Sequence, residues 1–137
     1  MIVLDASVWV SALVESDVHY AASEAWLSRW MRSGATIIAP ALMLAEVAGA
    51  ISRRGDTDLD GRKAISILEA LPGVQWVYPD HPLRVQAAEL AADLSRRGAD
   101  ATYVAIAQRF DVSLLTWDQD QAARARPVVR VERVIGS

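Results

Sequence analysis

Residues 2–5 read Ile2-Val3-Leu4-Asp5, an apolar run that ends in a single acid. A short continuous apolar run is typical of a strand that is covered on both faces. Comparable runs recur along the chain, and we expect strands at 2–5, 36–39, 74–77, 113–116 and 128–131, the last of them interrupted by Arg130. The sequence therefore predicts a short, mainly parallel sheet of five strands.

Helical stretches separate these strands. We expect them at residues 19–33, 41–54, 58–71, 83–97, 100–110 and 119–126. Several stop at a residue that commonly ends a helix, such as Gly34, Gly98 or Pro127. Strands that alternate with helices are the pattern of an α/β protein, so we predict a three-layer α/β/α sandwich.

The chain of 137 residues fits one domain, and no segment resembles a linker, so residues 1–137 are expected to form a single domain. The hydrophobic share of 53% argues against disorder, and the lack of cysteine excludes a disulfide scaffold and thiolate metal sites. The net charge of −3 argues against a general nucleic-acid coat protein. An acid at position 5 predicts that no signal peptide is present, and no apolar run is long enough for a membrane helix. We expect a cytoplasmic protein.

Four acids stand where a folding argument would place neutral residues. Asp5 ends an apolar strand, and Glu46 interrupts the apolar stretch 41–48. Asp100 opens an apolar helix, and Asp118 follows the fourth strand. A buried lone carboxylate is costly unless it is paired, protonated or bound to a metal. The arginines cluster in segments that look exposed, so we expect no set of buried cations to pair with these acids.

Topology predicts where the acids meet. Loops that follow the carboxyl ends of parallel strands gather at one edge of the sheet, where such folds bind ligands. Asp5 and Asp118 reach this edge directly, whereas Asp100 reaches it only if its helix runs antiparallel to the strands. An oxygen-only ligand set suits Mg²⁺ or Mn²⁺, ions that activate water for phosphodiester hydrolysis.

The acids lie in segments that resemble one family. Residues 2–7, 40–47, 98–107 and 115–118, taken in this order and spacing, look like the motifs of the PIN-domain family, and most of all like its VapC-type toxins from toxin–antitoxin pairs. The resemblance implies that Asp5, Glu46, Asp100 and Asp118 are both the catalytic and the metal-binding residues, holding Mg²⁺ or Mn²⁺. It also implies hydrolysis of RNA to a 5′-phosphate and a 3′-hydroxyl.

The same resemblance implies supporting residues and partners. Ser7 and Thr116 match hydroxyl positions beside the acids, and Asp120 is a candidate for an additional outer ligand. The expected substrate is an RNA of the tRNA or ribosomal RNA class. The expected partners are a second copy of the chain, in a homodimer, and a VapB-like antitoxin whose tail lies along residues 41–71.

Other interpretations of the acids remain open from the sequence. Asp5 and Asp100 are also good helix caps, and Asp118 could be ordinary loop polarity. A receiver-like domain would want an acid beside Asp5 and a lysine near the last strand, but the only lysine is Lys63. A haloacid-dehalogenase-type phosphatase would want an acid two residues after Asp5, where Ser7 stands. The remaining alternative is a catalytically silent PIN-like module that binds RNA or regulates.

Overall fold

The computed structural model describes residues 1–134, which form one parallel sheet of five strands. The strand order is β3–β2–β1–β4–β5, and every neighbouring pair is parallel. The strands are β1 (Ile2–Leu4), β2 (Ile37–Pro40), β3 (Val74–Val77), β4 (Ser113–Leu115) and β5 (Val131–Glu132). The predicted five-stranded parallel sheet is confirmed; the last three residues of the expected domain, 135–137, lie outside the described residues.

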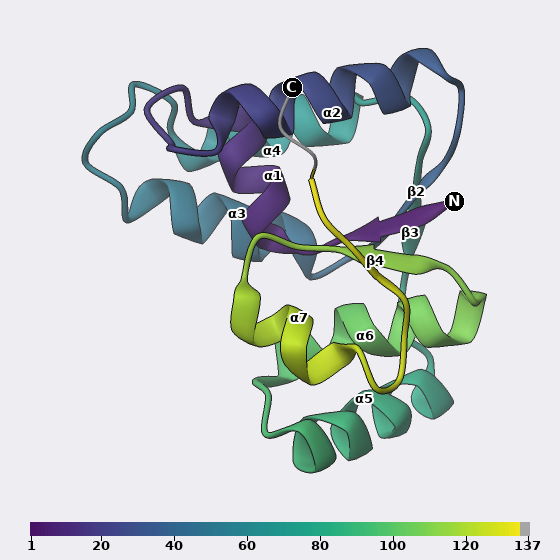
Figure 1. Cartoon of the computed structure of the whole chain (residues 1–137). Helices are drawn as coiled ribbons and strands as arrows, with labels where there is room; N and C mark the ends of the chain where they lie inside the picture. The colour runs from purple at the N-terminus through teal and green to yellow at the C-terminus, as the bar shows by residue number, and fades with distance from the viewer. Residues whose placement is uncertain (135–137) are drawn as a thin grey trace.

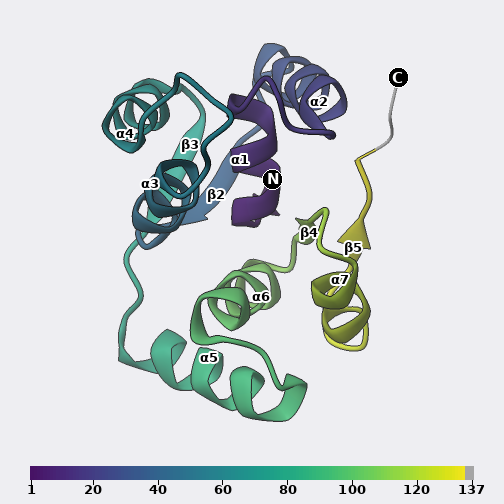
Figure 2. The ribbon, with the colours of Figure 1, turned by 90° about the vertical axis from the view of Figure 1, so that its left-hand side faces the viewer.

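Seven helices form the outer layers of the described part of the chain. One face of the sheet carries α1 (Ala6–Leu13), α2 (Tyr20–Arg32), α3 (Met43–Ser52) and α4 (Gly61–Ala70), and the other carries α5 (His81–Leu94), α6 (Gly98–Phe110) and α7 (Gln119–Ala125) (Figures 1 and 2). The predicted three-layer sandwich is confirmed. None of the helices within residues 1–134 has the length and apolar character needed to cross a membrane.

Three local expectations were wrong. Helix α1 was expected only as a helix that Asp5 could cap and was missing from the expected ranges, because its core side chains leave little polar face to reveal the helical period. Strand β5 begins later than expected, because the backbone N–H groups of Val128 and Val129 both bond to Ala125 O and prolong the turn after α7. Gly98 does not end α5: Ser95, in the left-handed conformation at φ 52°, does so.

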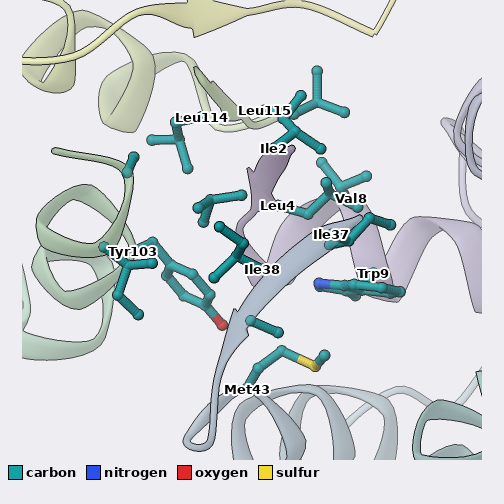
Figure 3. Close-up of a cluster of buried hydrophobic side chains, with 14 of the residues drawn as sticks. Ile2, Leu4, Val8, Trp9, Ile37, Ile38, Met43, Tyr103, Leu114 and Leu115 are labelled. Atoms are coloured by element: carbon teal, nitrogen blue, oxygen red, sulfur yellow. The ribbon is translucent and has the colours of Figure 1, made fainter. Parts of the chain in front are cut away.

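The core surrounds β1, whose Ile2, Val3 and Leu4 are all buried. Figure 3 shows Leu4, Val8 and Trp9 packed beside β2, with Tyr103 of α6 approaching Ile38 from another side. Helix α6 contacts β1, β2 and β4 and ends just before β4 begins. Since β4 runs parallel to the other strands, α6 runs antiparallel to them and begins at their carboxyl ends. Asp100, in the first turn of α6, therefore lies at the same edge as Asp5.

Candidate active site

Asp5 lies where the ends of two neighbouring strands meet. Its backbone N–H donates to Leu115 O at 3.2 Å, which joins the end of β1 to the end of β4. Its side chain accepts from Ser7 N at 3.0 Å and so caps the start of α1. The capping interpretation of Asp5 is therefore correct. A cap uses only one carboxylate oxygen, Oδ1, so Oδ2 is not needed for capping.

Hydroxyl groups, not cations, hold the Asp5 carboxylate. Ser7 Oγ donates to Oδ1 at 2.5 Å, and Thr116 Oγ1 donates to Oδ2. Burial, with a smaller contribution from the nearby charge of Asp100, raises the pKa of Asp5 to about 6, although these hydrogen bonds oppose the rise. Both hydroxyl residues singled out in the sequence thus contact the first acid directly.

Glu46 projects from α3 toward the same edge. Tyr103 of α6 donates its hydroxyl to Glu46 Oε1 at 2.6 Å, across the carboxyl end of β2. In Figure 3 the Tyr103 ring turns its hydroxyl toward this end of the strand. Partial burial raises the pKa of Glu46, and the charge of Asp100 adds to the rise. An acid that interrupts an apolar helix is therefore aimed at the other acids.

Asp100 occupies the first turn of α6 and is buried. It is not the helix cap that the sequence allowed, since Arg97 takes that position without a side-chain cap bond. Its charge raises the pKa values of Asp5, Glu46 and Tyr103. Asp100 therefore acts electrostatically on both Asp5 and Glu46 at this edge of the sheet.

Asp118 and Asp120 meet an arginine that the sequence analysis had placed among the exposed ones. Asp118 caps α7 by accepting from Gln121 N at 3.0 Å. The nearly buried Arg96 donates to Asp118 Oδ2 at 3.4 Å, to Asp120 Oδ2 at 2.5 Å and to Asp100 Oδ2 at 3.0 Å. The expectation that no buried cation pairs with the acids is wrong for this side of the site.

The residues fit a hard divalent cation by donor type and by charge. All candidate ligands offer carboxylate oxygens, and neither Asp5 nor Glu46 forms an ion pair within residues 1–134. Side-chain positions are a separate matter, because no three acids or histidines of the described chain converge as metal ligands do. The acids therefore lie at one edge of the sheet, but their side chains would have to move closer together to bind one ion.

Two residues that matter here escaped the sequence analysis. Arg96 belongs to the arginines that were expected to be exposed, and Tyr103 lies within the motif at residues 98–107. A signal for Tyr103 was present, since its position three residues after Asp100 places both on one face of α6. No comparable signal marked Arg96, because a loop between two helices fixes its direction.

The aromatic residues near the site pack within the protein. His19 stacks on Trp117 with ring centroids 3.8 Å apart, and Trp117 Nε1 donates to Ser23 Oγ at 2.6 Å. Trp26 and Trp30 stack on each other within α2, with centroids 5.1 Å apart. Trp117 is therefore packed against the protein on at least one face of its ring.

Comparison with known proteins gives a family model and a set of solved structures. The PIN domain model matches residues 2–127. No curated protein matches the chain significantly.

Several solved structures share the fold at low sequence identity. Mycobacterium tuberculosis VapC20, described as a toxin that cleaves the sarcin–ricin loop, has a TM-score of 0.70 and 21% identity over 90% of this chain and 94% of its own. VapBC2 from Rickettsia felis, bound to a promoter DNA fragment, has a TM-score of 0.70 and 17% identity over 97% of this chain and 98% of its own. FitAcB from Neisseria gonorrhoeae has a TM-score of 0.64 and 22% identity over 96% of each chain.

Proposed function

The chain belongs to the PIN-domain family, and from that premise we propose that it is a divalent-metal-dependent endoribonuclease, the VapC-like toxin of a toxin–antitoxin pair. The observation that carries the proposal is the pair Asp5 and Glu46. Both carboxylates are held by hydroxyl donors without a cation, and burial raises both pKa values. A protein keeps such groups together at a cost, and cation binding is the function that offsets that cost.

The four acids form the metal-binding set in this proposal. Asp5, Glu46 and Asp100 would hold Mg²⁺ or Mn²⁺, and Asp118 completes the set from the end of β4. When bound, such an ion lowers the pKa of a water molecule and stabilises the charge that develops on the phosphate. In the reaction the water oxygen bonds to phosphorus, the bond from phosphorus to O3′ breaks, and O3′ takes a proton. The products are a 5′-phosphate and a 3′-hydroxyl.

The supporting residues act through these acids. Ser7 and Thr116 orient the Asp5 carboxylate from two sides, and Thr116 Oγ1 also accepts from Asp118 N at 3.0 Å. One threonine thus links the acid after β1 to the acid after β4. Asp120 pairs with Arg96 and Arg124, so we assign it to holding these arginines instead of to the ion.

A pocket beside Asp118 offers a place for the RNA strand. Its walls include Thr116 and Trp117 together with the exposed Arg126 and Arg133. Neither of these two arginines forms an ion pair within the described residues. Free guanidinium groups next to the acids would bind the phosphates that flank the scissile one, which helps an acidic protein to bind RNA.

Partners follow from the likeness to the VapC and FitAcB structures. The similar solved structures include VapBC2, bound to a DNA fragment from its promoter, and FitAcB. We propose a VapB-like antitoxin and a homodimer for this chain as well, with residues 41–71 as the antitoxin surface. For the substrate we propose RNA of the tRNA or ribosomal RNA class.

The test uses purified chain free of any partner. It is incubated with total tRNA and with ribosomal RNA, with Mg²⁺, Mn²⁺ or a chelator, beside an Asp5→Asn variant. We expect cleavage that needs the ion and is lost in the variant, and products that a 5′-phosphate-dependent exonuclease degrades.

Two outcomes would contradict the proposal in different ways. Cleavage that survives in the chelator or in the Asp5→Asn variant would move the chemistry away from these acids. Binding of RNA without cleavage under every ionic condition would favour the catalytically silent module.

A further inference from the structure

Two adjacent arginines at the site have opposite environments. Arg96 has only 10% of its side chain exposed, whereas Arg97 has 84% exposed. Both donate to the same atom, Asp100 Oδ2, at 3.0 and 3.2 Å. Only Arg96 also reaches Asp118, Asp120 and the Gln121 side-chain oxygen, the last at 2.9 Å.

The backbone fixes the direction of Arg96. Helix α5 ends at Ser95, whose φ of 52° lies in the left-handed region that non-glycine residues seldom adopt. Directly after this turn, the Arg96 N–H donates to Ala91 O at 3.0 Å. Arg124 then ties α7 to the same helix end by donating to Leu94 O at 3.0 Å while it pairs with Asp120. These bonds therefore fix the position of the Arg96 guanidinium within the site.

Charges on this side of the site cancel. Asp100, Asp118 and Asp120 are paired with Arg96, Arg97 and Arg124. Across the site, Asp5 and Glu46 accept from hydroxyl groups, and Asp5 also from the Ser7 backbone N–H. Neither forms an ion pair within residues 1–134, so two negative charges remain. Arg97 acts on Glu46 only through space, as the smallest influence on its pKa. The uncompensated charge thus equals that of one divalent ion.

We propose that Arg96 is a positioning residue that takes the place of a second cation, so that this active site binds one divalent ion, on the side of Asp5 and Glu46. The inference rests on the proposed function, because it concerns the same acids. The guanidinium holds Asp118 and Asp120 in place whether or not an ion is bound. Its fixed fork of donors suits three carboxylates at once, as a mobile ammonium would not.

The experiment counts bound ions instead of measuring cleavage. The whole chain is freed of metal and titrated with Mn²⁺, and the free ion is followed by electron paramagnetic resonance with calorimetry as a second readout. We expect one ion for the wild type and two for Arg96→Gln, since the variant leaves Asp118 and Asp120 without this counter-ion. Arg97→Gln is the matched control, with the same charge change beside the same Asp100, and we expect it to bind one ion. Arg96→Lys keeps the charge and should also bind one.

Circular dichroism of each variant verifies the fold, so that an additional ion is counted only for a folded chain. Two ions in the wild type, or an Arg96→Gln variant that binds one ion or none, would overturn the inference. An equal gain in Arg97→Gln would overturn it too, because any lost positive charge would then suffice. A wild type that binds one ion but cleaves no RNA would contradict the proposed function and leave the ion count valid.

Discussion

The two sides of the acid site hold their carboxylates by different means. At the end of β1, Asp5 lies between the hydroxyl groups of Ser7 and Thr116. At the end of β4, Asp118 and Asp120 face the guanidinium of Arg96. Hydroxyl donors orient a carboxylate but leave its charge, whereas a guanidinium orients it and cancels the charge. The first side therefore keeps an uncompensated charge for a cation, whereas the charge of the second is already compensated.

One site can thus keep some acids available to a cation and hold others in a fixed position. A buried carboxylate with neutral partners costs folding free energy until an ion arrives. A carboxylate paired with a nearly buried arginine is already compensated and keeps its position without the ion. The predictions below remove one of these supports at a time, beginning with the largest expected effect.

The largest effect comes from replacing the acid on the hydroxyl side. Asp5→Asn keeps a capping oxygen for Ser7 but loses the charge, so we expect RNA cleavage to fall by about three orders of magnitude, equivalent to about 4 kcal/mol of transition-state stabilisation. Single-turnover cleavage with saturating Mg²⁺ measures this loss. Without metal, the same variant should be more stable than the wild type above pH 6, because no buried charge remains.

The pH dependence of stability has a definite sign here. Burial raises the pKa of Asp5 from 3.8 to about 6, so between these values the folded chain holds a proton that the unfolded chain has released. The free energy of unfolding of the metal-free wild type should therefore fall as pH rises through this interval, by at most about 3 kcal/mol. Urea denaturation from pH 4 to 7 tests the slope. An identical slope in Asp5→Asn would assign the effect to another group.

The next effect concerns Thr116, the hydroxyl that links both ends of the site. Thr116→Val keeps the shape but removes the donor to Asp5, so the pKa of Asp5 should rise above about 6 and protons should compete better with the ion. We expect Mn²⁺ affinity at pH 7 to fall by about 10–100-fold. Thr116→Ser retains the hydroxyl and serves as control; equal loss in both variants would mean that packing, not the hydrogen bond, is responsible.

A smaller effect is expected at Glu46. Tyr103→Phe removes the hydroxyl that donates to Glu46 Oε1, and water can replace it because Glu46 is only partly buried. Mn²⁺ affinity should fall by less than about tenfold, in line with about 1 kcal/mol for one hydrogen bond. A calorimetric titration of this variant beside Thr116→Val decides the order. A larger loss in Tyr103→Phe would make Glu46, and not Asp5, the more dependent ligand.

The smallest effect is expected at one arginine that pairs with two aspartates away from the site. Arg54 joins Asp17 at 2.7 Å and Asp56 at 2.8 Å, and it keeps 27% of its side chain exposed. The hydrogen bond from Arg54 lowers the pKa of Asp56, but solvent and salt screen both ion pairs. Arg54→Gln should lower Tm slightly, less so in high salt, and should leave the Mn²⁺ count at one. A change in that count would show that surface arginines also control the site.

Much of this arrangement could be predicted from the sequence because it depends on chain order. Asp5 and Asp118 had to reach the carboxyl edge, since Asp5 follows β1 directly and Asp118 lies three residues after the end of β4. Asp100 could be placed only once α6 was known to run antiparallel to the strands, and a helix between two parallel strands provides this. Helix α1 escaped notice because a buried helix lacks the polar face that reveals a helical period.

What could not be predicted depends on single backbone angles. Arg96 and Arg97 are indistinguishable in the sequence, yet the left-handed turn at Ser95 directs one inward and leaves the other exposed. Local sequence rules favour glycine or asparagine at such a turn, and serine gives no such signal. The pairing of a buried arginine with three acids is therefore a property of the folded chain alone.

The most direct test of the whole account is a crystal structure of the chain soaked in Mn²⁺, with diffraction measured at the manganese absorption edge. We predict one anomalous peak, within bonding distance of Asp5, Glu46 and Asp100, with the Arg96 guanidinium still against Asp118 and Asp120. A second peak in place of that guanidinium, or a site occupied away from Asp5 and Glu46, would contradict it.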